Sequence, residues 1–149
     1  MMSLGFSCAG MWLLCVISVG DGLGKRRYVT MSVSHLGKTV SAIALIDSGN
    51  TLRDPVSGEQ VLVVSARIAE QLTGLSRKEL SRPIETLAAN PGKGFRLIPY
   101  QAVGQGNGML LGMRFPEVWI GERKRSAVIA FAAEGIGDQQ IYQALVAAV

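Results

Sequence analysis

The chain has 149 residues, a formal net charge of +4 and an apolar fraction of 48%. This length fits one compact domain with a core of ordinary size. The positive charge would suit an anionic partner, but the basic clusters at residues 25–27 and 123–125 contain no interleaved aromatic residue, which argues against nucleic-acid binding. Both cysteines, Cys8 and Cys15, lie in the N-terminal stretch, so the rest of the chain has neither a disulfide framework nor a thiolate zinc site.

The first predicted segment covers residues 1–22, in which no charge precedes Asp21. Its apolar run, residues 4–20, is slightly shorter than the roughly 20 residues that span a bilayer. A secretory signal peptide would carry positive charge before such a run, whereas here the positive charges follow at residues 25–27. This order places the following domain in the cytoplasm. We therefore expect a membrane anchor at residues 1–22.

Two other interpretations of this segment stay open. A stretch of this length also fits a buried helix of a soluble protein. It also fits the last span of a longer, truncated membrane domain. In each case residues 23–149 form the folded domain.

Residues 28–64 follow the two-residue period of β-strands. Val29, Met31 and Val33 alternate with polar residues and predict a half-buried strand, followed by a turn at residues 36–38. A second strand at residues 39–46 ends in a continuous apolar run. A turn at residues 54–58 precedes a third strand at residues 60–64.

The next stretch is predicted to be helical. Ser65 is suited to cap a helix whose apolar face carries Ile68, Ala69, Leu72 and Leu75. Residues 77–89 also have a helical pattern, although Pro83 interrupts it.

After a loop at residues 90–94, strands are expected at residues 95–100, 109–115, 118–121 and 127–132. The cluster at residues 123–125 is predicted to be an exposed hairpin tip. A closing helical stripe is formed by Ile141, Tyr142, Leu145 and Val146. The pattern as a whole indicates a small, mainly β domain with short helices.

The tripeptide Asp47-Ser48-Gly49 follows directly after the buried second strand. Such a tripeptide is common in turns, but at this place it also suits an aspartic protease, in which two nearby carboxylates share one proton. Asp47 would supply a carboxylate, and Ser48 would hydrogen-bond to a partner loop. Gly49 would let backbone amides approach the carboxylate.

A second catalytic motif is absent from the sequence. Asp21, Asp54 and Asp138 are followed by Gly, Pro and Gln, respectively, and the chain is too short for two lobes. If Asp47 is catalytic, the second carboxylate has to come from another copy of the chain, as Asp47 across a two-fold axis.

Competing catalytic sites find little support. His35 is the one histidine in the sequence, so a metal site built from several histidines is excluded. We expect His35 to lie at the end of a strand. The glycine-rich residues 104–108 lack the Lys-Ser/Thr ending of a phosphate-binding loop. We expect no metal and no organic cofactor.

The sequence resembles the sporulation sigma-E factor-processing peptidases of endospore-forming bacteria over residues 28–145. The resemblance rests on the string ALIDSGNTLRDP at residues 44–55, on RLIPY at residues 96–100, and on YQAL at residues 142–145. The run Leu110-Leu111-Gly112 is also similar to an element that crosses beneath the catalytic loop in retroviral-type proteases, although an ordinary strand explains it equally well.

This resemblance implies a retropepsin-like acid-protease β-barrel half that dimerises on the cytoplasmic side of the mother-cell membrane. Its implied substrate is a membrane-associated sigma factor precursor, from which the protease removes the pro-sequence. Asp47 is the implied catalytic residue, flanked by Ser48 and Gly49. Two alternatives remain: a non-catalytic, membrane-associated dimer that binds a regulatory partner, and the same protease with another protein substrate.

Overall fold

The computed structural model describes residues 27–47, 49–50, 52–102, 106–137 and 140–147. The predicted anchor at residues 1–22 lies outside these residues, and so does Ser48. Within the described part of the chain, none of the helices has the length and apolar character needed to cross a membrane.

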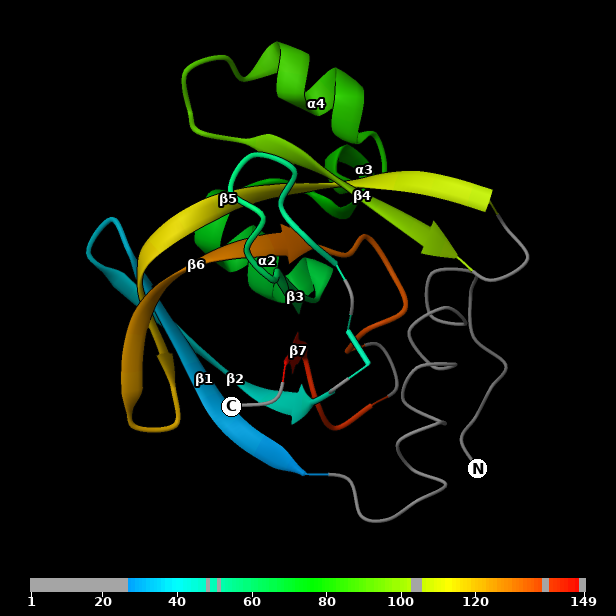
Figure 1. The fold of residues 1–149 in the computed structure, drawn as a ribbon. Coiled ribbons are helices and arrows are strands. Elements are labelled where there is room, and N and C mark those ends of the chain that lie inside the picture. Colours follow the sequence, from blue (N-terminus) through cyan, green and yellow to red (C-terminus); the bar gives the residue numbers. More distant parts are fainter. Residues whose placement is uncertain (1–26, 48, 51, 103–105, 138–139, 148–149) are drawn as a thin grey trace.

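Six strands close into a barrel, and a seventh extends it (Figure 1). The order is β1-β2-β7-β3-β6-β5-β4, and an additional pairing of β1 with β5 closes the ring of six. The strands are β1 (Tyr28–His35), β2 (Lys38–Ile46), β3 (Leu62–Val64), β4 (Arg96–Ala102), β5 (Gly106–Ile120), β6 (Arg123–Phe131) and β7 (Ala144–Val146). The expectation of a mainly β fold is confirmed.

The turn predicted near Gly37 joins β1 and β2 into an antiparallel hairpin. Its two strands pair from Tyr28 with Leu45 to His35 with Lys38. Both residues of the tight turn have positive φ, 51° at Leu36 and 79° at Gly37, which matches the twist of the flanking strands.

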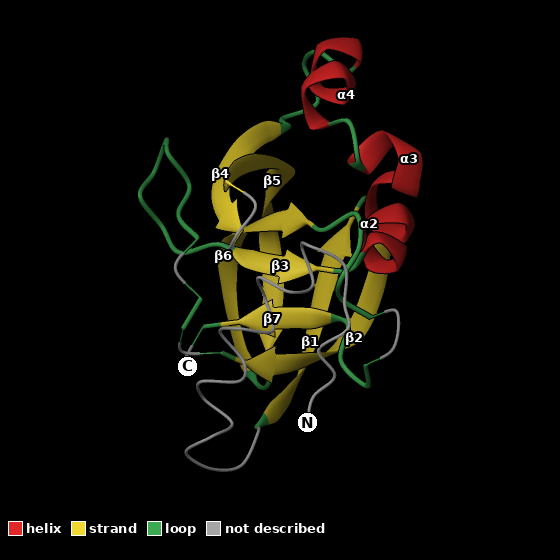
Figure 2. Cartoon of the chain, turned by 90° about the vertical axis from the view of Figure 1, so that its right-hand side faces the viewer, coloured by secondary structure: helices red, strands yellow, loops and turns green. Residues whose placement is uncertain are grey.

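Three short helices gather at one side of the barrel (Figure 2): α2 (Ala66–Thr73), α3 (Arg77–Leu80) and α4 (Pro83–Ala89). Ser65 caps α2 as predicted, because its side chain accepts a hydrogen bond from the backbone N of Ile68. Pro83 divides the helix expected at residues 77–89, since it occupies the first turn of α4, where its missing N–H costs nothing.

The prediction of a closing helix was wrong. Residues 144–146 form β7, which pairs in parallel with β2 and antiparallel with β3. The three residues of β7 are all completely buried, because β7 is a central strand whose two faces are both covered by apolar side chains. Such a strand has apolar residues at successive positions and no alternation.

Two further differences concern β5 and β6. The strands expected at residues 109–115 and 118–121 are one strand, β5, with an irregularity in its pairing between Phe115 and Val118. The basic cluster at residues 123–125 begins β6, beside the turn rather than at its tip. Leu111 and Gly112 pair with both β4 and β6, so this run is part of the barrel wall.

Two apolar clusters stabilise the fold on opposite faces of the sheet. The first includes residues from all six barrel strands and the buried face of α2, so it fills the interior. The second covers the outer face of β2, β7, β3 and β6. It contains Leu45, Leu52, Val61, Val63, Ile98, Val128, Ala130, Ala132, Ile136, Tyr142 and Leu145.

Strand directions decide which loops share an end of the barrel. Because β2 and β7 are parallel and β7 is antiparallel to β3, the ends of β2 and β7 lie where β3 begins. β6 runs parallel to β3, and its residue Ile129 pairs with Leu62, the first residue of β3. The segment that follows β2 therefore lies near the start of β3, while α2 follows the other end of β3.

Candidate active site

Asp47 is the first residue after β2, at the end of the barrel just described. Its backbone N donates a hydrogen bond of 2.7 Å to the carbonyl oxygen of Val146, which continues the pairing of β2 with β7. The side chain is buried, with 6% of the residue exposed. Two central strands thus deliver a carboxyl group to a fixed place at the end of the barrel.

The turn after Asp47 folds back on its carboxyl group. The backbone N of Gly49 donates to Oδ1 of Asp47 at 3.0 Å, and the backbone N of Asn50 donates to the carbonyl oxygen of Asp47 at 3.2 Å. Gly49 itself is exposed. The roles expected for Ser48 and Gly49 at a catalytic loop stay predictions, and Ser48 lies outside the described residues.

Burial raises the pKa of Asp47 above its ordinary value, and the hydrogen bond from Gly49 opposes this only in part. A carboxyl group in this condition takes up and releases a proton closer to neutral pH than an exposed aspartate does. That property suits a general acid or base.

Asn50 holds the turn against the residues that precede β3. Its Nδ2 donates to the carbonyl oxygen of Val61 at 2.9 Å, and its Oδ1 accepts from the backbone N of Leu52 at 3.0 Å. Gln60 adds a third link, because its Nε2 donates to the carbonyl oxygen of Asn50. Asn50 is 5% exposed, so these bonds are made away from solvent, where they hold a loop firmly.

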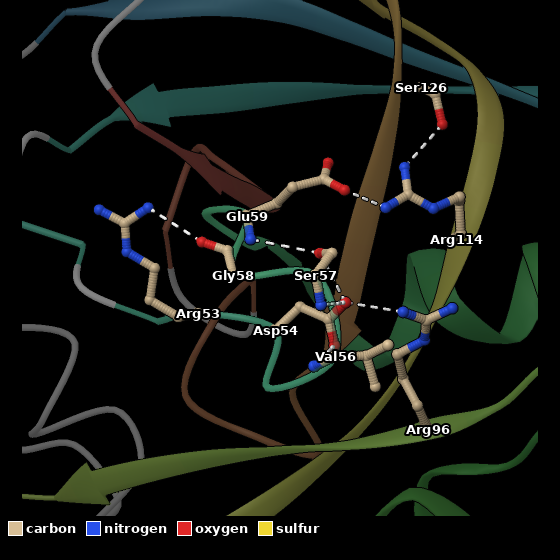
Figure 3. A network of polar contacts seen from close by, with 9 residues as sticks. All are labelled: Arg53, Asp54, Val56, Ser57, Gly58, Glu59, Arg96, Arg114 and Ser126. Carbon is tan, nitrogen blue, oxygen red and sulfur yellow. Dashed lines mark hydrogen bonds and ion pairs between the residues drawn. The ribbon is translucent and has the colours of Figure 1, made fainter.

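Asp54 is completely buried and surrounded by donors (Figure 3). Its carboxylate accepts from the backbone N of Val56 at 3.3 Å and of Ser57 at 3.2 Å, and from Ser57 Oγ at 2.8 Å. Nη1 of Arg96 pairs with it at 2.7 Å. This ion pair joins the turn at residues 55–57 to β4.

The same contacts decide the charge of Asp54. Burial would raise its pKa, but the bonds from Ser57 and Val56 and the positive charge of Arg96 outweigh burial and lower the pKa. Asp54 is thus held as a carboxylate that supports the loop, in agreement with its expected role in a turn.

Sequence reasoning did not identify Asn50, Gln60 or Arg96 as supports of this loop. Asn50 and Arg96 lie within the strings on which the family resemblance rests, so the resemblance was the signal by which they could have been found. His35, at the end of β1 as expected, stacks edge-on against Phe115 with ring centroids 5.1 Å apart. The described residues contain no group of three or more His, Cys, Asp or Glu placed to hold a metal ion.

Comparison with known proteins identifies the family. The family model Peptidase U4, described as Sporulation factor SpoIIGA, matches residues 1–148. The chain therefore belongs to this family. A sporulation sigma-E factor-processing peptidase of Priestia megaterium is 31% identical over 83 residues, which is 52% of this chain and 27% of the relative. The matched part thus spans about a quarter of the relative's length. No solved structure matches the chain.

Proposed function

We propose that this member of the SpoIIGA family is an aspartic endopeptidase that acts as a homodimer, with one Asp47 from each copy. The observation that carries the proposal is the buried Asp47 at the end of β2, whose pKa is raised and whose carboxyl group accepts a bond from Gly49. We assign the six-stranded barrel to the retropepsin-like half of an acid-protease site.

In this mechanism the two Asp47 carboxyl groups share one proton. The ionised one removes a proton from a water molecule, which attacks the peptide carbonyl, while the protonated one donates to the carbonyl oxygen. Burial favours this shared state, because like charges in a poorly solvated site cannot both ionise. Ser48 and Gly49 would support the two loops where they meet.

The state of Asp54 supports the proposal that a second copy is needed. Among the described residues it is the one other aspartate, and its carboxylate is already occupied by Arg96, Ser57 and Val56. It therefore cannot supply the partner carboxyl group. A two-fold axis that brings Asp47 opposite Asp47 of the partner provides it instead.

The proposed substrate is the precursor of a sporulation sigma factor, cut so that its pro-sequence is removed. The family and the name of the Priestia megaterium relative support this choice. We further propose that residues 1–22 anchor the chain in the mother-cell membrane, with residues 23–149 as the protease domain on the cytoplasmic side, because the positive charges follow the apolar run.

The test is co-expression of the protein with its precursor, followed by immunoblotting for the shortened product. Asp47→Asn keeps the size and the acceptor oxygen for Gly49 but removes the carboxyl group, and processing should disappear. Glu70→Gln, at an exposed position of α2, is the matched control and should process normally. Processing that survives Asp47→Asn would overturn the assignment of Asp47 as the catalytic residue. Binding of the precursor by the wild-type protein without any processing would overturn the proposal in favour of a non-catalytic binding module.

Dimerisation has its own test. When wild type and Asp47→Asn are co-expressed in equal amounts, random pairing leaves about one quarter of the dimers with two carboxyl groups. Processing should therefore fall to about one quarter, whereas independent monomers would retain about half.

A further inference from the structure

A basic groove opens at the same end of the barrel as Asp47. It has a volume of about 440 Å³ and is lined by Glu59, Gln60, Leu62, Ile120, Arg123, Lys124, Arg125, Ser126 and Ala147. Two lining residues adjoin the Asp47 turn: Gln60 donates to the carbonyl oxygen of Asn50, and Ala147 follows Val146, which accepts the bond from Asp47. Asp47 itself does not line the groove.

The groove carries uncompensated positive charge. Arg123, Lys124 and Arg125 are exposed, and none of them forms an ion pair within the described part of the chain. Glu59 is the one acidic residue of the lining, and its carboxylate is paired with Arg114 (Figure 3). The hydrogen bond from Arg114 lowers the pKa of the Glu59 carboxyl group, which favours its ionised form. Its negative charge is thus paired with Arg114 and does not compensate the basic residues of the groove.

The other lining groups suit a polypeptide. Leu62 and Ile120 form an apolar floor, since both are buried within the interior cluster. Gln60 and Ser126 add polar groups beside this floor. An extended peptide presents apolar side chains, amide groups and carboxylates, which these three kinds of lining group can bind. A concave site also fits an extended peptide better than it fits a flat membrane surface. The lining contains no aromatic side chain on which nucleic-acid bases could stack.

We propose that this groove is a docking site for an acidic segment of the polypeptide substrate, beside the place where the peptide bond is cut. The proposal rests on the protease function proposed above, since it concerns how that enzyme holds its substrate. Arg123, Lys124 and Arg125 attract the carboxylates of the segment and increase its local concentration near the Asp47 turn.

The first test measures binding without cleavage. The full chain in a neutral detergent is titrated into a fluorescent octaglutamate peptide and, separately, into an octaglutamine peptide. The octaglutamate peptide should bind in a salt-dependent manner, and the octaglutamine peptide should not. The double variant Arg123→Glu and Arg125→Glu should weaken binding at least about ten-fold. The control Arg67→Glu and Arg82→Glu, at exposed positions in α2 and immediately before α4, makes the same change in net charge and should leave binding unchanged.

Equal weakening by both double variants would overturn the proposal, because attraction would then depend on net charge alone. Binding to vesicles that contain phosphatidylserine, with none to octaglutamate, would also overturn it in favour of a lipid surface. The Asp47→Asn variant separates the two proposals. If it binds octaglutamate normally and still supports processing, the groove stands and the catalytic assignment fails; if binding is absent and processing depends on Asp47, the groove fails alone.

Discussion

Replacing Arg96 by Met tests whether the loop after Asp47 depends on the ion pair with Asp54. Asp54 is completely buried, while 27% of the Arg96 side chain is exposed. Arg96→Met would leave a buried carboxylate with its three bonds from Val56 and Ser57 but without a countercharge. Removing one partner of a buried pair costs about 3–5 kcal/mol, and the remaining donors place the expected loss near the lower bound, about 3 kcal/mol.

The dependence on pH follows from the pKa of Asp54. That pKa is lowered in the folded protein, so ionised Asp54 contributes stability above its ordinary pKa of about 3.9, and the contribution is lost as the pH falls through the folded-state value. Without Arg96 the pKa is lowered less. The difference in unfolding free energy between wild type and Arg96→Met should therefore shrink as the pH falls from about 5 towards about 2.

The assay is urea unfolding followed by circular dichroism, at neutral and at acid pH. The matched control is Arg114→Met, which also breaks an arginine–carboxylate pair, but one whose side chains are 35% and 43% exposed. It should cost about 0–1 kcal/mol. A similar loss for both variants, or a loss for Arg96→Met that does not change with pH, would refute the reasoning.

Three further predictions concern the site and the barrel wall. Asp47→Asn should raise the unfolding free energy at neutral pH, because the raised pKa shows that the fold disfavours the ionised form; the gain should vanish below the ordinary pKa of about 3.9, as pH-dependent denaturation would measure. Asn50→Ala should cost about 2–3 kcal/mol in urea unfolding, since it leaves the Val61 carbonyl oxygen without its side-chain donor. Gly112→Ala should lower the melting temperature by an amount equivalent to about 1–3 kcal/mol, because a Cβ there would lie 2.8 Å from the Ile129 carbonyl oxygen.

Local signals in the sequence were sufficient for much of the fold. The alternation in β1, the turn at Gly37 and the cap at Ser65 each depend on residues within a few positions of one another, so these features could be predicted from the sequence. The position of Asp47 at the end of a buried strand was predicted for the same reason.

Features that depend on distant partners were not predictable in this way. Residues 144–146 are a strand because they pair with residues 44–46 and 63–64, and a short apolar run without those partners also fits a helix. Asp54 and Arg96 are 42 positions apart, so no spacing rule connects them. β5 was predicted as two strands, at residues 109–115 and 118–121, and its pairing with β6 is irregular at this point, where Pro116 lies.

The place of β7 in the barrel has a consequence for the order of events during synthesis. Asp47 is fixed by a bond to Val146, a residue that leaves the ribosome long after Asp47 has done so. The wall between β2 and β3 cannot close before residues 144–146 arrive, and pairings over such a separation form slowly. The Asp47 turn is thus assembled among the last parts of the domain, so a nascent chain would carry the carboxyl group without yet holding it in its working position.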